Sequence, residues 1–112
     1  MKLITAVIQP SKLDDVNRAL HDAGVRGLTV TPVEGYGRQK GHTEVYRGAE
    51  YVVNFVPKTK LEIVVPAEDV DQIIAAIVDS TQTGTVGDGK LWITDVDTTI
   101  RLSSGERGPA AV

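Results

Sequence analysis

The chain has 112 residues, a net charge of −3 and no cysteine. This length suits one domain, and no apolar run approaches the ~20 residues that span a bilayer, so we expect one soluble domain. The lack of cysteine excludes disulfides and thiolate metal sites and is compatible with a reducing cytoplasm. An acidic balance argues against broad nucleic-acid affinity, which needs a basic surface.

The first half of the chain predicts a strand, a helix and a second strand. Residues 3–8 are apolar on both alternations, as in a strand covered on both faces. Ser11 and Asp14 have the spacing of a helix N-cap pair. An apolar stripe at helical spacing follows and Gly24 ends it; the stripe consists of Leu13, Val16, Ala19, Leu20 and Ala23. A strand is expected around residues 28–31, and Pro32, which lacks a backbone donor, belongs at an edge or a bulge near the point where the chain leaves the sheet.

The second half repeats this order. Strand residues return near 52–56 and continue through 60–65, and Pro66 marks a turn. A core-facing helix follows, with apolar residues at Val70, Ile73, Ile74, Ile77 and Val78. A glycine-rich connection at about 82–90 leads to a strand at 91–96, in which Trp92 is most simply a core residue. An extended piece at 98–102 precedes a polar tail at about 102–112.

The predicted order is strand, helix, strand, strand, helix, strand, which is the ferredoxin-like α+β arrangement. Two helices can cover only one face of its four-stranded sheet. Several strands carry apolar residues on both alternations, so the second face also needs cover. We therefore expect self-association.

The stretch from Gly35 to Tyr51 shows no helical or strand periodicity and contains four glycines, at positions 35, 37, 41 and 48. Loops this long inside a compact domain are uncommon and are usually functional lids, binding loops or disordered linkers. Tyr46 and Tyr51 lie within it, so we expect a loop that is offered to a partner. An exposed tyrosine there is accessible to a modifying enzyme, although it could equally be a contact residue.

The glycine-rich connection is a candidate anion site. Gly84, Gly87 and Gly89 allow successive backbone N–H groups to converge, and Lys90 adds a positive charge suited to phosphate. It is not a Walker loop, because the Gly-Lys pair precedes a strand instead of opening a helix. An ordinary turn between a helix and a strand remains an alternative.

Charged residues at the base of the long loop form a second candidate. Arg38, Gln39 and Lys40, with Lys58 across the base, could hold a small anion such as a dicarboxylate, or could simply be solvated. His21 and His42 have no ligand partner at suitable spacing, so a protein metal site is not expected. The pair Ser103-Ser104 has no nearby histidine base, so nucleophilic catalysis is unsupported.

Two motifs resemble those of the nitrogen-regulatory PII signal-transduction family. Residues 46–51, YRGAEY, are similar to the modification motif of its protruding T-loop, here about 37–55. Residues 83–93, TGTVGDGKLWI, are similar to its second motif, which covers the B-loop, here about 82–90. The resemblance extends along nearly the whole chain as a single domain, 1–112. Residues 35–37 and 105–108 resemble actinobacterial members.

The resemblance implies a homotrimer with nucleotide sites in the clefts between subunits, where ATP and ADP compete. Gly87, Asp88, Gly89 and Lys90 would cradle the phosphates, with Arg38 and Arg101 assisting. The residues implied to line the nucleotide cleft are Thr29, Gly37 and Val64.

The resemblance also implies that 2-oxoglutarate binds together with Mg-ATP. Gln39 would help to hold Mg²⁺ and 2-oxoglutarate, Lys58 would pair with a carboxylate, and Lys40 and Gly87 would complete the site. Tyr51 would be the nucleotidylylated residue, by uridylylation or, as in actinobacterial relatives, adenylylation. The implied targets are an ammonium transporter, a nucleotidylyltransferase or an enzyme of nitrogen or arginine metabolism. A membrane would be met only indirectly, through a transporter.

The chain departs from the usual family pattern at five positions. Gln9 replaces a basic residue and Ser103 replaces a second phosphate-binding arginine. The other departures are Ser11 for an aromatic residue, Asn54 for aspartate and Thr85 for lysine. Loss of one charge-assisted contact costs roughly 1.5–3 kcal/mol, which is about tenfold to a hundredfold in affinity.

The resemblance thus implies a cytoplasmic, non-enzymatic regulator that senses adenylates and 2-oxoglutarate. The alternatives are a small nucleotide-dependent enzyme on the same fold, for which no general base can be named, or a diverged PII-like binder with altered ligand specificity. An RNA-binding module would need exposed aromatic residues and a basic surface, which this composition disfavours.

Overall fold

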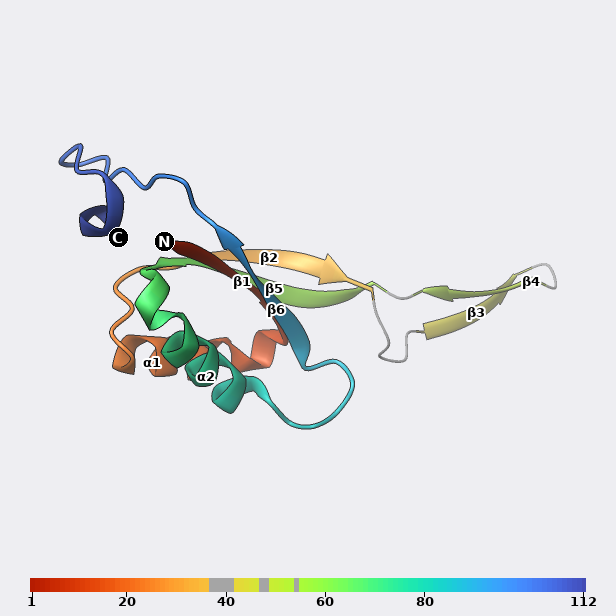
Figure 1. The fold of residues 1–112 in the computed structure, drawn as a ribbon. Coiled ribbons are helices and arrows are strands. Elements are labelled where there is room, and N and C mark those ends of the chain that lie inside the picture. Colours follow the sequence, from red (N-terminus) through yellow and green to blue (C-terminus); the bar gives the residue numbers. More distant parts are fainter. Residues whose placement is uncertain (37–41, 47–48, 54) are drawn as a thin grey trace.

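A computed structural model describes residues 1–36, 42–46, 49–53 and 55–112, with side chains outside 37–54. Its main sheet has four antiparallel strands in the order β2-β5-β1-β6. These strands are β1 (Lys2–Ile8), β2 (Thr29–Gly35), β5 (Val56–Val65) and β6 (Gly89–Asp95). The helices are α1 (Leu13–Asp22) and α2 (Val70–Thr81), and both lie on one face of the sheet (Figure 1). The predicted ferredoxin-like α+β fold is confirmed.

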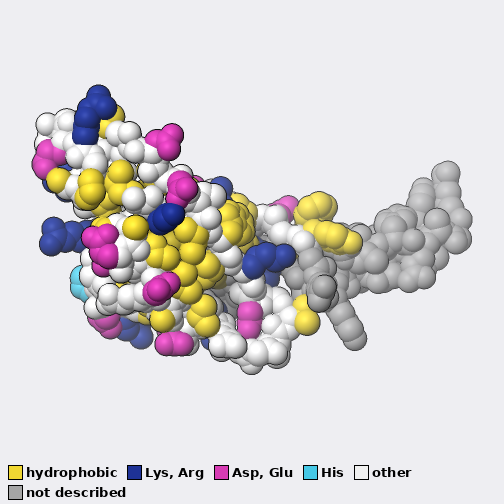
Figure 2. Space-filling view, in the orientation of Figure 1, with side chains coloured by type: hydrophobic (Ala, Val, Ile, Leu, Met, Phe, Trp, Pro, Cys, Tyr) yellow, Lys and Arg dark blue, Asp and Glu magenta, His cyan; other side chains and the backbone are white. Residues whose placement is uncertain are grey.

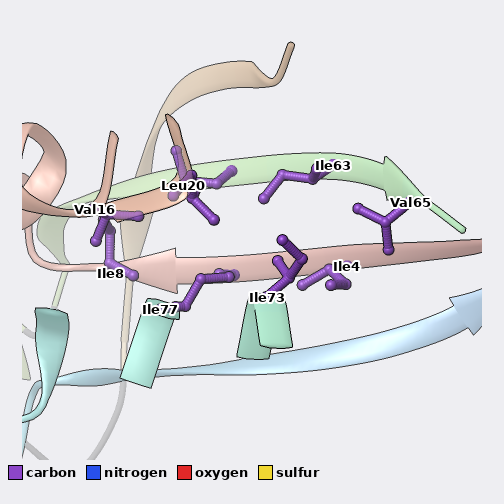
Figure 3. Packing of buried hydrophobic residues seen from close by; sticks show 10 residues of the cluster. Ile4, Ile8, Val16, Leu20, Ile63, Val65, Ile73 and Ile77 are labelled. Atoms are coloured by element: carbon purple, nitrogen blue, oxygen red, sulfur yellow. The ribbon is translucent and has the colours of Figure 1, made fainter. Parts of the chain in front are cut away.

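The core lies between the helices and this face of the sheet. Alternate residues of β1 and β5 point toward the helices, where Val16, Leu20, Ile73 and Ile77 meet them (Figure 3). The predicted stripes are confirmed at these four positions and at Leu13, Ala23 and Val70, which pack against the core. Val78, at the edge of the predicted stripe of α2, is 37% exposed instead. The positive φ of Gly24, 93°, also confirms that residue as the end of the first helix.

The predicted cap of α1 is wrong. Ser11 lies inside a short 3-10 turn, η1 (Pro10–Lys12), and no side chain caps either η1 or α1. The backbone provides the contact instead, because the N–H of Lys12 donates to the carbonyl oxygen of Gln9 at 3.0 Å. A similar turn, η2 (Ala67–Asp69), precedes α2, and a third, η3 (Gly108–Ala111), lies in the tail.

The prediction that Trp92 belongs to the core is also wrong. Trp92 is 45% exposed and pairs in register with Thr5 on the face that no helix covers. Its neighbour Leu91 packs against the core, and successive residues of a strand point to opposite faces. The open face carries one row of aligned residues across all four strands, made up of Thr29, Glu62, Thr5 and Trp92.

The long segment after β2 is more regular than expected. Strand β3 (His42–Tyr46) pairs antiparallel with β4 (Ala49–Val53), so the interpretation of 35–51 as lacking strand structure is wrong. The pairing satisfies the backbone N–H and C=O groups of the two segments, which contain the strand-forming residues valine, threonine and tyrosine. The hairpin lies beyond the ends of β2 and β5 (Figure 1). At its base the rings of Tyr36 and Phe55 have centroids 6.4 Å apart.

Gly89 fits where no other residue can, because it begins β6 in close contact with β1. Its φ is +104°, and a Cβ atom there would lie 1.9 Å from the carbonyl oxygen of Val7. We expect Gly89→Ala to lower the free energy of unfolding by about 2–4 kcal/mol, from backbone strain and the clash together. Urea denaturation measures this change.

Gly24→Ala is the matched control, because Gly24 has a similar φ of +93° but no atom within 4 Å of the added Cβ. It should cost only about 1–2 kcal/mol, the strain of a left-handed residue. Equal losses for the two variants would contradict the close contact at Val7.

Candidate functional site

The connection between α2 and β6 is held closed by the carboxylate of Asp88. One oxygen, Oδ2, accepts the backbone N–H of Thr83 at 2.7 Å and that of Gly84 at 3.0 Å. The other, Oδ1, accepts the Thr83 hydroxyl at 2.5 Å and the side-chain amide of Gln9 at 3.3 Å. Four donors thus converge on one side chain and join both ends of the connection to the end of β1.

These bonds stabilise the charged form of Asp88. The side-chain hydrogen bond from Thr83 and then its backbone N–H lower the pKa of Asp88 below its ordinary value, with smaller contributions from Gly84 and the charge of Lys12. Asp88 therefore stays ionised at neutral pH. We call this carboxylate with its donors from Gln9, Thr83 and Gly84 the Asp88 brace, because its hydrogen bonds hold the loop in place.

A cavity of about 620 Å³ lies beside the braced connection. Its lining brings together four predicted residues of the connection, Gly87, Asp88, Gly89 and Lys90, with Lys58 from β5. The ammonium group of Lys58 donates to the carbonyl oxygen of Gly87 at 2.8 Å. The cavity therefore combines two lysines with a turn in which Gly87 and Gly89 both have φ of 104°, a composition suited to an anion.

A second cavity, of about 470 Å³, lies near the C-terminal segment. Thr29 and Val64 line it together with Glu62 and Thr99. Within the described residues, the buried hydroxyl oxygen of Thr99 has no hydrogen-bond partner. Figure 2 shows hydrophobic side chains gathered between the C-terminal segment and the helices, with charged side chains around them. This cavity offers apolar walls and a few polar groups, which is the usual composition of a small-molecule site.

Arg101 lies in the C-terminal segment, away from the braced connection. Its guanidinium donates to the carbonyl oxygen of Ala110 at 2.9 Å and contacts the carboxylate of Glu106 at 3.3 Å. The length of strand β6 separates Arg101 from Gly89. From Gly89 to Asp95, the two ends of this strand, the distance is about 20 Å. The two segments lie at opposite ends of β6 (Figure 1). One chain therefore does not bring Arg101 and Lys90 together.

Comparison with known proteins finds relatives that align along the whole chain. The family profile described as nitrogen regulatory protein P-II matches residues 1–106. The nitrogen regulatory protein P-II of Pasteurella multocida is 57% identical over 112 residues, covering all of both chains. That of Haemophilus influenzae is 56% identical, and nitrogen regulatory protein P-II 1 of Escherichia coli K12 is 55% identical, again over both full lengths.

The chain belongs to the nitrogen regulatory protein P-II family. Its relatives are named as regulatory proteins, which agrees with a signalling function in nitrogen regulation. No helix in the described part of the chain is long and apolar enough to cross a membrane.

The structure divides the residues implied by the P-II resemblance into separate groups. Lys58 and residues 87–90 line one cavity, Thr29 and Val64 line the other, and Arg101 lies in the C-terminal segment. The predicted positions Gly37, Arg38, Gln39 and Lys40 lie outside the described residues. Tyr51 is in β4, where its backbone pairs with Glu44.

Sequence reasoning missed Thr83, Glu62 and Thr99, and treated Gln9 only as a departure. The spacing of Thr83 and Asp88 around two glycines is a signal for a side-chain-braced turn and could have been used. Glu62 and Thr99 could not be found in this way, because only the fold places them beside Thr29.

The brace at Asp88 predicts a measurable titration. Since the pKa of Asp88 is lowered in the folded chain, its bonds contribute stability above its ordinary pKa and lose it as the pH falls through the folded value. The amide proton shifts of Thr83 and Gly84, followed by NMR, should titrate with a midpoint below 3.8. The Asp88→Asn variant should show no such step, and a midpoint at or above 3.8 in the unmodified protein would contradict the brace.

Proposed function

We propose that this P-II protein is a cytoplasmic, non-enzymatic sensor of ATP, ADP and 2-oxoglutarate that acts as a homotrimer. Ligand binding would alter the T-loop, 37–55, and thereby its contacts with target proteins. The targets would be an ammonium transporter, a nucleotidylyltransferase or an enzyme of nitrogen or arginine metabolism. The observation that carries the proposal is that the residues expected to bind nucleotide lie in two groups at opposite ends of the sheet.

The cavity beside the B-loop supports a phosphate subsite. Lys58 and Lys90 contribute positive charge, and the turn at 87–89 brings backbone close to the cavity. Arg38, from outside the described residues, would add a further cation. The Asp88 carboxylate is already engaged by four donors, so its contribution is to hold the shape of the loop.

The second cavity supports an adenosine subsite. Val64 offers an apolar wall, while Thr29, Glu62 and Thr99 would offer polar groups to a purine edge. Gly37 would complete the cleft. Arg101 would turn from Glu106 and Ala110 toward the phosphates of the nucleotide.

A trimer explains why these subsites lie apart in one chain. Each cleft would combine the B-loop end of one subunit with the C-terminal end of its neighbour. The open face of the sheet supports this assembly, because Trp92 is 45% exposed there and Leu3 and Val7 are only partly buried. Association would remove these side chains from water.

Lys58 would link the nucleotide to 2-oxoglutarate. Its ammonium group now contacts the carbonyl oxygen of Gly87 in the B-loop, and it could turn to a carboxylate of the ligand. Gln39 would contribute to Mg²⁺ shared by ATP and 2-oxoglutarate, and Lys40 would assist. Ligands that prefer one T-loop arrangement would shift its population, and nucleotidylylation of Tyr51 would change its charge.

Subunit complementation tests the shared cleft. Lys90→Ala trimers and Arg101→Ala trimers should each bind ATP about tenfold to a hundredfold more weakly, because a charged contact is lost. Unfolding and refolding the two variants together at equal amounts should restore full affinity at about a quarter of the clefts, through random assortment. Titration calorimetry measures the restored fraction.

Trimers of each variant that are unfolded and refolded alone are the controls, and the double variant should never recover. If the site lay within one chain, mixing would restore nothing. That outcome, or a protein that remains monomeric in analytical ultracentrifugation, would overturn the proposal of an intersubunit site.

Coupling between ligands is a separate prediction. Since Lys58 contacts the B-loop directly, 2-oxoglutarate should bind with measurable heat only when Mg-ATP is present, and Lys58→Met should abolish this binding while ATP still binds. The exposed Arg18 on α1, which lines neither cavity, offers a control as Arg18→Met. Binding of 2-oxoglutarate that ignores nucleotide would contradict the coupling.

A further inference from the structure

The end of β1 lies directly against the B-loop. In the antiparallel β1–β6 ladder Ile8 pairs with Gly89, so Gln9, which follows Ile8, stands opposite Asp88, which precedes Gly89. In the β1–β5 ladder Ile8 pairs with Thr59, which brings Lys58 next to Gln9 on the other side. Gln9 therefore lies between the lysine of one strand and the brace of the loop.

The backbone of Gln9 is fixed independently of its side chain. It is extended, with φ of −66° and ψ of 135°, and its carbonyl oxygen accepts the N–H of Lys12 at 3.0 Å. The side chain is partly buried, and its amide donates to Oδ1 of Asp88 at 3.3 Å. Gln9 also lines a cavity of about 490 Å³ together with Lys58, Val86 and Gly87.

From this juxtaposition we infer that Gln9 is a positioning residue for the B-loop and sets the charge balance of the proposed phosphate subsite. This inference rests on the proposed nucleotide function for its second half only. Gln9 is the one donor to Asp88 in the described structure that comes from outside the connection, since the others belong to Thr83 and Gly84. It thereby anchors the loop to the end of β1, one of the two inner strands of the sheet.

The neutrality of Gln9 has a chemical consequence. Its amide satisfies the Asp88 carboxylate without neutralising it, so the negative charge remains next to the cavity. The cations that face this region are Lys12 from the 3-10 turn, Lys90 from β6 and Lys58 from β5. A cation at position 9 would offset the carboxylate and favour the highly charged phosphates.

Three substitutions separate anchoring from charge. Gln9→Met keeps the size and removes the donor, Gln9→Lys keeps a donor and adds a positive charge, and Gln9→Glu places a like charge against Asp88. Gln72→Met is the matched control, because Gln72 is exposed on α2. Thermal melting and sedimentation of each variant establish that fold and assembly persist.

The first measurement uses the full chain without nucleotide. Gln9→Met and Gln9→Glu should speed hydrogen exchange at the amides of Thr83 and Gly84 by about twofold to tenfold, as expected for loss of one hydrogen bond. The pH midpoint of these amides should rise in Gln9→Met and Gln9→Glu and fall in Gln9→Lys. A purely structural role would not move that midpoint in opposite directions.

The second measurement is nucleotide affinity by calorimetry. Gln9→Lys should bind ATP about twofold to tenfold more tightly, with a smaller gain for ADP, and Gln9→Met should bind both more weakly. Unchanged amides in all three variants would overturn the positioning role. Amides that respond while the unmodified protein binds no nucleotide would support the positioning role and overturn the proposed function instead. Equal gains for ATP and ADP would overturn the charge-balance part.

Discussion

The carboxylate of Asp88 is the interaction on which the candidate site depends. It receives donors from the start of the connection after α2 and from the end of β1, so it closes the loop and attaches it to the sheet. Gly89 makes this attachment possible, because its missing side chain lets β6 begin against the backbone of Val7. A loop held by its own hydrogen bonds in this way would need less ordering on binding a ligand.

The antiparallel sheet decides what the loop can reach. β1 and β5 place Gln9 and Lys58 next to it, while β6 carries the chain away toward Thr99 and Arg101 at the other end. The chain thus has two cavities at opposite ends of one sheet. Association through the open face would pair unlike ends of neighbouring subunits, and any change in one cleft would then act on two subunits at once.

Local patterns succeeded where the local environment determines the outcome. The stripes of α1 and α2 and the end of α1 at Gly24 follow from helical spacing and backbone freedom, and the structure has them. The prediction that Trp92 is buried was wrong, because the apolar character of a residue does not tell which face of its strand is covered. The sequence did not predict the β3–β4 hairpin, because strand pairing depends on contact between two segments and the glycines in this stretch hide the strand pattern. The prediction of Ser11 as the helix cap was wrong, because a 3-10 turn occupies residues 10–12 and α1 begins only after it.

The sequence by itself determined the fold class, the family and the chemical types available at the B-loop, since periodicity and two motifs are properties of neighbouring residues. Only the tertiary structure decided that Gln9 meets Asp88, that Lys58 meets Gly87, and that Thr29 shares a cavity with Thr99. Each of these contacts joins residues at least 29 positions apart in the chain. Strand register brings them together, and register is set by how the whole sheet packs on its helices.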